Sequence, residues 1–336
     1  MGSEPVRVAS IGLGWWSDVL AAAAGRASGI EIVSCFTRSE DKRQAFSEKF
    51  DCAAALSFEE ILEDDSIQAI INTTPNNVHL ETTRRAAEAG KHVFLDKPIA
   101  NSVAEGMEIA RLCRDAGVVL AIGYQRRREN QFLWIKERIE QGEFGQLVQA
   151  EANISRDRLG QFDISSWRYR AEGMPGGVML QIGIHYTDVL EMLLGDIESV
   201  SGMTSQLVLP GDNPDVACLV MTHENGAVST LSASYASASE FYLMNIYGKK
   251  ASAYYSLHQG LQYLKQGDES PTPVAFDKND AIAEELEEFA NCVRDGGEPE
   301  VGGERASKSL AVIRAGVKSA REGRVVTVAE IMETGE

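Results

Sequence analysis

Two stretches of the chain carry side chains suited to acid–base chemistry. Asp96-Lys97-Pro98 directly follows an apolar run, and a lysine held between an acid and a rigid proline can exchange a proton with a ligand. Gln181, His185 and Asp188 are spaced so that they share one face of a helix. A histidine on such a face is suited to general-base work. Taken alone, a lysine in such a segment is more often a surface lysine, and a histidine on such a face is more often a core histidine than a catalytic one.

A possible ligand site lies near the N-terminus. An apolar run ends at Gly12-Leu13-Gly14, and an alanine-rich helical pattern follows at once. A strand, a glycine turn and a helix start form an anion site, because the first helical N–H groups point at the bound charge. Ser17 stands where a third glycine is usual, and its hydroxyl can cap the helix. The pattern predicts a dinucleotide site, although an ordinary glycine turn would show it too.

The aromatic pair after this turn is expected to divide its roles. We expect one of Trp15 and Trp16 to wall the cofactor site and the other to pack in the core.

The end of the second predicted strand bears on the choice of cofactor. It reads Phe36-Thr37-Arg38-Ser39, with no acid to bind a ribose 2′-hydroxyl. Arg38 can pair with a 2′-phosphate, Thr37 and Ser39 add hydroxyl groups, and Lys42 follows one turn later. We therefore favour NADP over NAD. The alternative is that Arg38 stacks on adenine and that both cofactors bind.

The first 125 residues alternate short apolar runs with helical patterns, which is typical of a doubly wound parallel sheet. Ligands of such sheets bind at the carboxyl ends of the strands. The polar turn Thr73-Thr74-Pro75-Asn76-Asn77 and the segment Asp96-Lys97-Pro98 both follow predicted strands. We expect Thr74, Pro75, Asn76 and Asp96 to contact the cofactor. His79 follows the turn, and either supports it from a helix or contributes to the same site.

Beyond residue 125 the pattern changes. Longer β-rich stretches separated by turn signals such as Glu224-Asn225-Gly226 predict antiparallel hairpins. We expect a helix over 178–194, two more over 282–294 and 306–322, and a surface loop over 265–273. The predicted organisation is an α/β Rossmann domain at 1–125, followed by an α+β substrate-binding and oligomerisation domain at 126–336 with a large, mainly antiparallel open sheet.

Composition excludes several function classes. The net charge of −18 over 336 residues argues against a broad nucleic-acid or acidic-membrane surface. The five cysteines are scattered without metal-ligand spacing, so we expect reduced thiols, no metal site and a cytoplasmic location. No signal sequence or apolar run long enough to cross a bilayer is evident. The partner that we expect is a small-molecule substrate.

Arginines gather where the two domains should join. Gly123-Tyr124-Gln125-Arg126-Arg127 lies at this junction, where we expect Tyr124, Gln125 and Arg127 to face a substrate. Further arginines follow at Arg128, Arg156, Arg158, Arg168 and Arg170. This group predicts either a pocket for an anionic substrate or a set of ordinary ion pairs with the intervening acids Glu129, Asp157, Asp163 and Glu172.

The segments together resemble the glucose–fructose oxidoreductase, inositol dehydrogenase and rhizopine-catabolism (Gfo/Idh/MocA) family. The resemblance rests on Gly12-Leu13-Gly14, Thr74-Pro75-Asn76 with His79, Asp96-Lys97-Pro98, and Gly176-Gly177 leading to Gly183-Ile184-His185, in this order along essentially the whole chain. It implies a Rossmann domain, a second domain with an open antiparallel sheet, and hydride transfer between a nicotinamide and a carbon bearing a hydroxyl on a sugar, cyclitol or related ring.

The resemblance also implies roles for single residues. Lys97 corresponds to the family lysine that contacts nicotinamide and substrate, and His185 to the histidine that exchanges a proton with the reacting hydroxyl. Trp167-Arg168 resembles a pair that lies near the cofactor in relatives. We expect Gln181, His185 and Asp188 to contact the substrate, and Gln181 to belong to the catalytic group.

Two departures from the family pattern bear on the chemistry. The family's Glu-Lys-Pro is Asp96-Lys97-Pro98 here, which keeps the charge, and its acid four residues before the histidine is Gln181. A neutral amide can hold a hydroxyl but cannot raise the basicity of a neighbouring group. We therefore expect the acid–base work to rest on Lys97 and His185 and the substrate to differ from an inositol-type polyol. The expected substrate is a ring alcohol or ketone, and the alternative within the enzyme class is an anionic keto-sugar or a carboxylated cyclic diol. A cofactor-binding sensor without turnover is the alternative of another class, and a dimer or tetramer formed through the second sheet is expected.

Overall fold

The computed structural model describes residues 4–157 and 166–336, which divide into two compact units. The first unit comprises Met1–Arg128 and Asp280–Ser307, and the second comprises Glu129–Asn279 and Lys308–Glu336. We expected one boundary at residue 125 and an uninterrupted second domain. The chain instead returns to the first unit at residue 280.

The first unit is a doubly wound sheet, as the sequence predicted. Its six strands are parallel in the order β3-β2-β1-β4-β5-β6, the order of a dinucleotide-binding domain. The elements are β1 (Val6–Ile11), α1 (Trp15–Ala24), β2 (Ile30–Phe36), α2 (Glu40–Phe50), β3 (Ala53–Ala54), α3 (Phe58–Glu63), β4 (Ala69–Asn72), α4 (His79–Glu88), β5 (His92–Asp96), α5 (Val103–Asp115), β6 (Leu120–Gly123) and α8 (Ala281–Asp295). Short 3₁₀ turns cover Asn76–Val78 and Gln125–Arg128.

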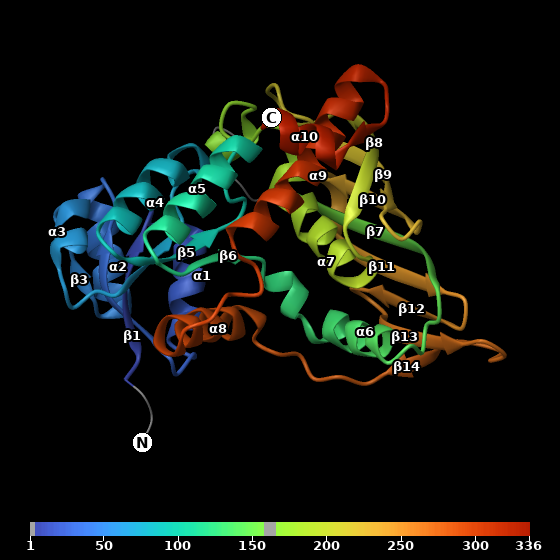
Figure 1. Ribbon diagram of the computed structural model, residues 1–336, viewed down its shortest axis with the longest axis horizontal. Helices are drawn as coiled ribbons and strands as arrows, with labels where there is room; N and C mark the ends of the chain where they lie inside the picture. The colour runs from blue at the N-terminus through green and yellow to red at the C-terminus, as the bar shows by residue number, and fades with distance from the viewer. Residues whose placement is uncertain (1–3, 158–165) are drawn as a thin grey trace. The chain divides into compact units, whose positions relative to one another are not determined.

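Helix α8 joins the first unit because its apolar stripe completes that core. Leu286 and Phe289 are fully buried with Val8 of β1 and Leu20 of α1. The rings of Phe94 and Phe289 lie 5.8 Å apart, edge to face. Figure 1 shows α8 beside α1. Each such buried side chain contributes about 2–3 kcal/mol of hydrophobic free energy. This burial places α8 in the first unit, although its late position in the sequence led us to assign it to the second domain.

The second unit is built on a nine-stranded mixed sheet of order β14-β13-β12-β11-β7-β10-β9-β8-β15, in which β7 and β10 are parallel and the other neighbours antiparallel. Its strands are β7 (Leu147–Asp157), β8 (Ile197–Ser205), β9 (Val216–His223), β10 (Val228–Ser234), β11 (Ala236–Gly248), β12 (Ala251–Ser256), β13 (Gly260–Lys265), β14 (Thr272–Val274) and β15 (Val326–Thr327). Its helices are α6 (Asn130–Glu140), α7 (Ile184–Leu194), α10 (Val328–Thr334) and the greater part of α9 (Gly303–Glu322).

The surface loop expected over 265–273 is the exposed connection 266–271 of a hairpin, in which Tyr263 pairs with Thr272 and Leu261 with Val274. One detail of this unit differs from expectation. A π-helical turn, Met179–Gly183, precedes α7 in the segment where we predicted one regular helix. Figure 1 shows α7 lying along the sheet, and α7 packs against β7 and β10.

Candidate functional site

The glycine turn after β1 has the geometry of a phosphate site. Gly12 has a φ of +83°, and a Cβ there would lie 2.5 Å from the backbone nitrogen of Thr74. Gly14 begins α1, and a Cβ there would meet nothing within 4 Å. The backbone is therefore open at the helix start, as close approach of a phosphate requires. The residues present fit the pyrophosphate of a dinucleotide.

Ser17 caps α1 as the sequence predicted. Its hydroxyl accepts from the amide of Gly14 at 2.9 Å and donates to the carbonyl of Gly14 at 2.7 Å, and the side chain is fully buried. A hydroxyl thus replaces the close packing that a third glycine would provide, and stabilises the turn that Gly12 begins.

The two tryptophans differ in environment. Trp15 is 53% exposed, whereas Trp16 is partly buried against the core shared by β1, α1 and α8. Trp16 is thus the one that packs in the core. A cofactor contact by Trp15 stays a prediction.

Polar contacts hold the loop after β4 against the turn after β1. The Thr73 hydroxyl donates to the carbonyl oxygens of Ile11 and Gly12 at 3.1 and 2.7 Å. Asn72 accepts from the amide and the hydroxyl of Thr74, and Asn76 donates to Asn101 at 3.1 Å. Thr73 belongs to the polar turn that the sequence indicated, whereas Asn72 and Asn101 were not singled out, although the carboxyl ends of neighbouring strands could have indicated them.

His79 joins this loop to the segment that carries Lys97. Its Nε2 lies 2.8 Å from the carbonyl oxygen of Thr74, and its Nδ1 lies 3.1 and 3.2 Å from those of Pro98 and Ile99. Burial lowers the pKa of His79, although the three carbonyl contacts act in the opposite direction. Because the side chain is 1% exposed, it supports the loops from behind. Of the two roles considered for His79, these contacts fit support of the turn, and a direct cofactor contact stays a prediction.

Lys97 lies at the carboxyl edge of the parallel sheet. It directly follows β5, whose last residue is Asp96, and both side chains are partly exposed. Pro98 and Ile99, which follow, are buried, and the Lys97–Pro98 peptide bond is cis. The chain therefore holds Lys97 between a strand end and a buried segment.

An exposed cationic group follows β2. Arg38, Ser39 and Lys42 are exposed, and the Ser39 hydroxyl accepts from the amide of Lys42, which caps α2. Arg43 donates to the carbonyl of Thr37 at 2.7 Å and lies over the Phe36 ring. Arg43 was not predicted, and it supports the segment on which Arg38 sits.

The arginines of the junction form ion pairs within the first unit. Arg127 is 5% exposed and its guanidinium lies 3.0 Å from Glu300. Arg128 lies 2.7 Å from Glu288. Tyr124 is 1% exposed and Gln125 partly buried. The substrate contacts that we expect of Tyr124, Gln125 and Arg127 stay predictions.

Ion pairing extends to the second unit, where Arg156 lies 3.5 Å from Glu240. Of the two interpretations of the arginine group, ordinary ion pairs hold for Arg127, Arg128 and Arg156. The partners described for them, Glu300, Glu288 and Glu240, are not the acids that lie near them in sequence. Arg158 and Asp163 lie outside the described residues.

In the second unit a double-glycine turn begins the helix that carries His185. A Cβ on Gly177 would lie 2.4 Å from the carbonyl oxygen of Pro214, and one on Gly176 would lie 2.6 Å from Val317. Both glycines have positive φ, +98° at Gly176 and +51° at Gly177. The π-helical turn follows, and such turns are frequent at functional sites.

The three polar residues of this helix differ in burial. Within the described stretch 176–191, Gln181 is the one side chain that is not buried, His185 is 7% exposed and Asp188 is fully buried. The substrate contact that we expect of Asp188 stays a prediction. Gln181 accepts a hydrogen bond from the hydroxyl of Tyr235, which the sequence gave no reason to connect with it.

Trp167 and Arg168 lie in a 3₁₀ turn of the second unit. The guanidinium of Arg168 stacks over the ring of Trp167, 4.6 Å from its centroid, and both side chains are partly exposed. Their predicted place near the cofactor stays a prediction.

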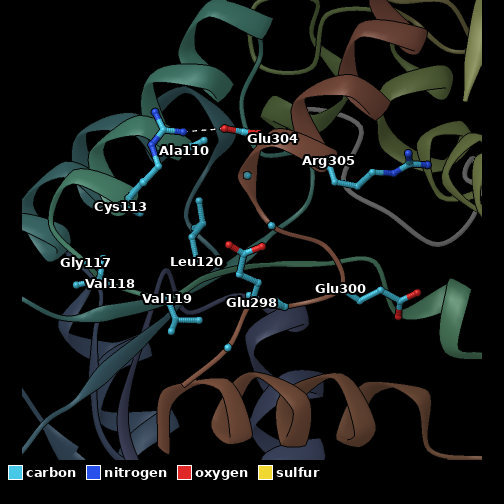
Figure 2. A pocket seen from close by; sticks show the side chains of 15 residues that line it. Ala110, Cys113, Gly117, Val118, Val119, Leu120, Glu298, Glu300, Glu304 and Arg305 are labelled. Atoms are coloured by element: carbon cyan, nitrogen blue, oxygen red, sulfur yellow. Dashed lines mark hydrogen bonds and ion pairs between the residues drawn. The ribbon is translucent and has the colours of Figure 1, made fainter. Parts of the chain in front are cut away.

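A cavity of about 460 Å³ lies elsewhere in the first unit, at the amino end of β6 (Figure 2). It is lined by 117–120 and by the segment between α8 and α9, and Arg114 and Glu304 pair at its rim at 2.7 Å. The glycine turn and Lys97 lie at the opposite, carboxyl edge of the sheet. This cavity is therefore separate from the nucleotide site.

Among the described residues, no group of three or more histidine, cysteine or acidic side chains is arranged to hold a metal ion. No helix in the described part of the chain is both long and apolar enough to cross a membrane.

Residues 6–124 match the "Oxidoreductase family, NAD-binding Rossmann fold", and residues 132–254 match the "GFO/IDH/MocA C-terminal domain". The scyllo-inositol 2-dehydrogenase (NAD(+)) of Bacillus subtilis is 30% identical over 287 residues, which cover 80% of this chain and 79% of that protein. An uncharacterized oxidoreductase of Schizosaccharomyces pombe is 34% identical over 177 residues, and this match spans 52% of the chain and only 47% of that protein.

Among solved structures, an inferred NADPH-dependent oxidoreductase from Desulfitobacterium hafniense superposes with a TM-score of 0.94 at 31% identity. The match covers 98% of this chain and all of that chain (100%). The two family domains match the chain in the expected order, and the Rossmann sheet and glycine turn lie within the N-terminal match. The chain belongs to the Gfo/Idh/MocA family and is an NAD(P)-dependent oxidoreductase.

Proposed function

We propose that this oxidoreductase transfers a hydride between the nicotinamide and a ring carbon that bears a hydroxyl or keto group on a sugar, cyclitol or related compound. The observation that carries the proposal is the position of Lys97, which follows β5 at the same sheet edge as the open glycine turn. The similarity to the scyllo-inositol 2-dehydrogenase of Bacillus subtilis supports this substrate class.

The residues of the first unit would hold the cofactor. Gly12, Leu13 and Gly14 fit the pyrophosphate, Thr74 to Asn76 fit the neighbouring ribose and nicotinamide, and Arg38 with Lys42 fits a 2′-phosphate. Because Arg38, Ser39 and Lys42 are exposed and no acid ends β2, NADP is the proposed preference. When bound, the nicotinamide supplies or accepts the hydride.

Oxidation of the hydroxyl releases a proton as well as a hydride, so a base must receive that proton. We assign this exchange to His185, with Lys97 holding the reacting oxygen and sharing the proton. In the reducing direction both residues act in reverse and return a proton to the new hydroxyl. Gln181 holds a substrate oxygen without titrating, because an amide carries no exchangeable charge at neutral pH.

The first experiment is a titration of the purified protein with NADPH and with NADH, followed by quenching of tryptophan fluorescence. Micromolar binding with a preference for NADPH is expected. Turnover of sugars, cyclitols and their ketones with the bound cofactor is then screened. Failure of both nucleotides to bind would contradict the proposal, and binding without turnover of any ring alcohol or ketone would favour the sensor.

Lys97→Ala tests the assigned chemistry. The variant should bind the cofactor and keep its fold while kcat falls about 100-fold or more, because removal of a proton-exchanging group costs that much. A folded, cofactor-binding variant with most of its kcat would refute the role of Lys97.

We also propose that the open sheet of the second unit pairs with another copy of the chain. Met203 and Cys218 are cross-strand partners on β8 and β9. Met203 is 79% exposed, and Val220 is 49% exposed between the buried Leu219 and Met221. Uncovered apolar side chains on a sheet face favour self-association. Light scattering of wild type and Val220→Glu should show a dimer or tetramer that the charge weakens. The five unpaired cysteines are compatible with the reducing cytoplasm.

A further inference from the structure

Asn72, the last residue of β4, is fully buried at the carboxyl edge of the parallel sheet. It pairs in register with Ile11 of β1 and Leu95 of β5, the strands that lead to the glycine turn and to Lys97. A buried amide needs partners for its oxygen and for its N–H groups. The partners that the structure describes for this side chain lie in the segment that follows β4.

The direction of each hydrogen bond around Asn72 is fixed by its partners. One atom of its amide group lies 3.1 Å from the backbone nitrogen of Thr74, and because a backbone N–H only donates, this atom is the oxygen Oδ1. Nδ2 then faces the hydroxyl oxygen of Thr82 at 2.7 Å. The Thr82 hydroxyl donates to the carbonyl oxygen of Val78 at 2.8 Å, so it accepts from Asn72. The amide of Asn72 therefore has one allowed orientation.

The side chain of Thr74 is bonded to the same amide. Its hydroxyl oxygen lies 2.7 Å from Oδ1 of Asn72. Since that amide oxygen carries no proton, the hydroxyl is the donor, and a threonine hydroxyl has a single proton. The Thr74 oxygen can therefore offer a ligand its lone pairs, because its proton is already committed to Asn72.

Thr74 lies directly against the glycine turn. A Cβ on Gly12 would lie 2.5 Å from the backbone nitrogen of Thr74, and the Thr74 carbonyl oxygen lies 2.8 Å from Nε2 of the buried His79. The backbone of Thr74 is thus held on both sides. Its side chain is partly exposed, at the edge of the sheet where ligands of such folds bind.

We propose that Asn72 is a positioning residue that makes Thr74 a hydrogen-bond acceptor toward the nicotinamide half of the cofactor. The group that Thr74 receives is a donor, and this half offers two kinds, the ribose hydroxyls and the carboxamide N–H. Phosphate and carbonyl oxygens only accept, so they are disfavoured at this place and one placement of the nicotinamide riboside is selected. This inference rests on the proposed place of the cofactor in the first unit.

The binding test compares NADPH with 2′,5′-ADP, which lacks the nicotinamide half; NADH and ADP replace them if NADH binds more tightly. Thr74→Val should raise the Kd for the dinucleotide about fivefold or more, whereas Thr74→Ser, which keeps the hydroxyl, should change it less than about twofold. Asn72→Ala should raise this Kd about threefold or more, although the Asn72 side chain is fully buried. The Kd for the fragment should stay within about twofold, because a collapsed site would weaken both ligands.

The double variant Asn72→Ala/Thr74→Val separates positioning from simple packing. If Asn72 acts through the Thr74 hydroxyl, the double variant loses less dinucleotide affinity than the product of the two single factors. Thr83→Val is the matched control, because Thr83 is a fully buried threonine of α4 whose hydroxyl has no hydrogen-bond partner among the described residues. Losses that multiply, or a Thr74→Val variant that binds like Thr83→Val, overturn the proposal.

The 3-acetylpyridine analogue of the dinucleotide distinguishes the two donors, because an acetyl group replaces its carboxamide. If the carboxamide N–H donates to Thr74, wild type and Thr74→Val bind this analogue equally. If a ribose hydroxyl donates, Thr74→Val loses the same factor with the analogue as with the natural dinucleotide.

Thermal unfolding of the same variants without nucleotide tests the contact itself. Coupled residues shift Tm by less than the sum of the single shifts, and additive shifts would refute the pairing of Asn72 with Thr74. Binding of neither NADPH nor NADH to wild type contradicts the proposed function. Normal binding that Asn72→Ala and Thr74→Val leave unchanged contradicts this inference alone.

Discussion

At the scale of single residues, buried polar side chains position the exposed ones that do chemistry. His79 contacts the carbonyls of Thr74 and Pro98. It therefore supports both the loop after β4 and the segment after β5 that carries Lys97. Tyr235 does the same for Gln181 in the second unit. His79 and Tyr235 are buried, whereas Lys97 and Gln181 are partly exposed.

Arg38→Ala should weaken binding of NADPH far more than binding of NADH. The guanidinium is exposed after β2, beside Lys42, and its expected partner is the 2′-phosphate that only NADP carries. Fluorescence titrations of both nucleotides measure the effect, which we expect to be about tenfold or more for NADPH. Arg111→Ala is the control, because Arg111 is an exposed arginine paired within α5 with Glu108 and Asp115. Equal losses for the two nucleotides would refute the role.

Cys52 should be the first of the partly and fully buried cysteines to be alkylated. A hydrogen bond from Cys35 lowers the pKa of Cys52, whereas the same bond together with burial raises the pKa of Cys35. Burial also raises the pKa of Cys113 to about 12. Since the thiolate is the nucleophile, iodoacetamide at pH 7.5 followed by peptide mass spectrometry should label Cys52 well before Cys35 and Cys113. Labelling of Cys113 first would contradict this order.

At the scale of elements, the turn between β1 and α1 depends on the loop after β4. Gly12 needs its positive φ for the turn and its missing side chain for the approach of Thr74. The π-helical turn before α7 is a comparable irregularity in the second unit, and it carries Gln181. Each irregular element therefore lies where the site residues are.

Gly12→Ala should abolish tight cofactor binding and lower stability. A methyl group would lie 2.5 Å from the backbone nitrogen of Thr74 and 2.7 Å from the carbonyl carbon of Thr73, so the loop after β4 must move. A positive φ adds backbone strain of about 1 kcal/mol or more. Thermal unfolding and nucleotide titration measure both effects. Gly14→Ala is the control for stability, since nothing lies within 4 Å of its Cβ position, and a Gly12→Ala variant with wild-type Tm and affinity would show the interpretation to be wrong.

At the scale of the whole molecule, the chain makes two units from interleaved segments. The helix α8 and the first turn of α9 belong with the N-terminal sheet, and the remainder of α9 belongs with the C-terminal one. Stability is consequently distributed over residues far apart in sequence, and buried histidines of both units contribute to its dependence on pH.

The free energy of unfolding should fall as the pH falls below about 6.5. Burial lowers the pKa of His79, His92 and His223 from 6.5. The unfolded chain therefore binds protons at pH values where the native histidines stay neutral, and the stabilisation is complete above pH 6.5 and lost as the pH decreases. For His79 and His223 the slope reaches at most about 1.4 kcal/mol per pH unit each.

Thermal unfolding between pH 7.5 and pH 5 tests this dependence. His223→Asn keeps a donor toward the Gly195 carbonyl, which lies 2.7 Å from Nδ1 of His223, and it should flatten the pH profile. His258→Gln, at an exposed histidine, should leave the profile unchanged. A wild-type Tm that does not fall in this interval would contradict the prediction.

The sequence by itself determined the parts of this protein that local pattern controls. The run from Val6 through Gly14 into α1 predicted a strand, a turn and a helix, because the period of apolar residues and the glycines act within a few residues of one another. The segment Asp96-Lys97-Pro98 and the Gly176-Gly177 turn were found in the same way. The family, the parallel first sheet and the antiparallel character of the second followed.

Only the tertiary structure decided which distant residues meet. The pairing of Tyr235 with Gln181, of Arg127 with Glu300 and of α8 with the first sheet depends on chain topology. Local pattern does not contain this information, because an arginine carries the same signal whether its acid is two or 173 residues away. The same holds for burial, because the positions of Asp188 and Arg127 in the sequence did not indicate that both side chains are buried.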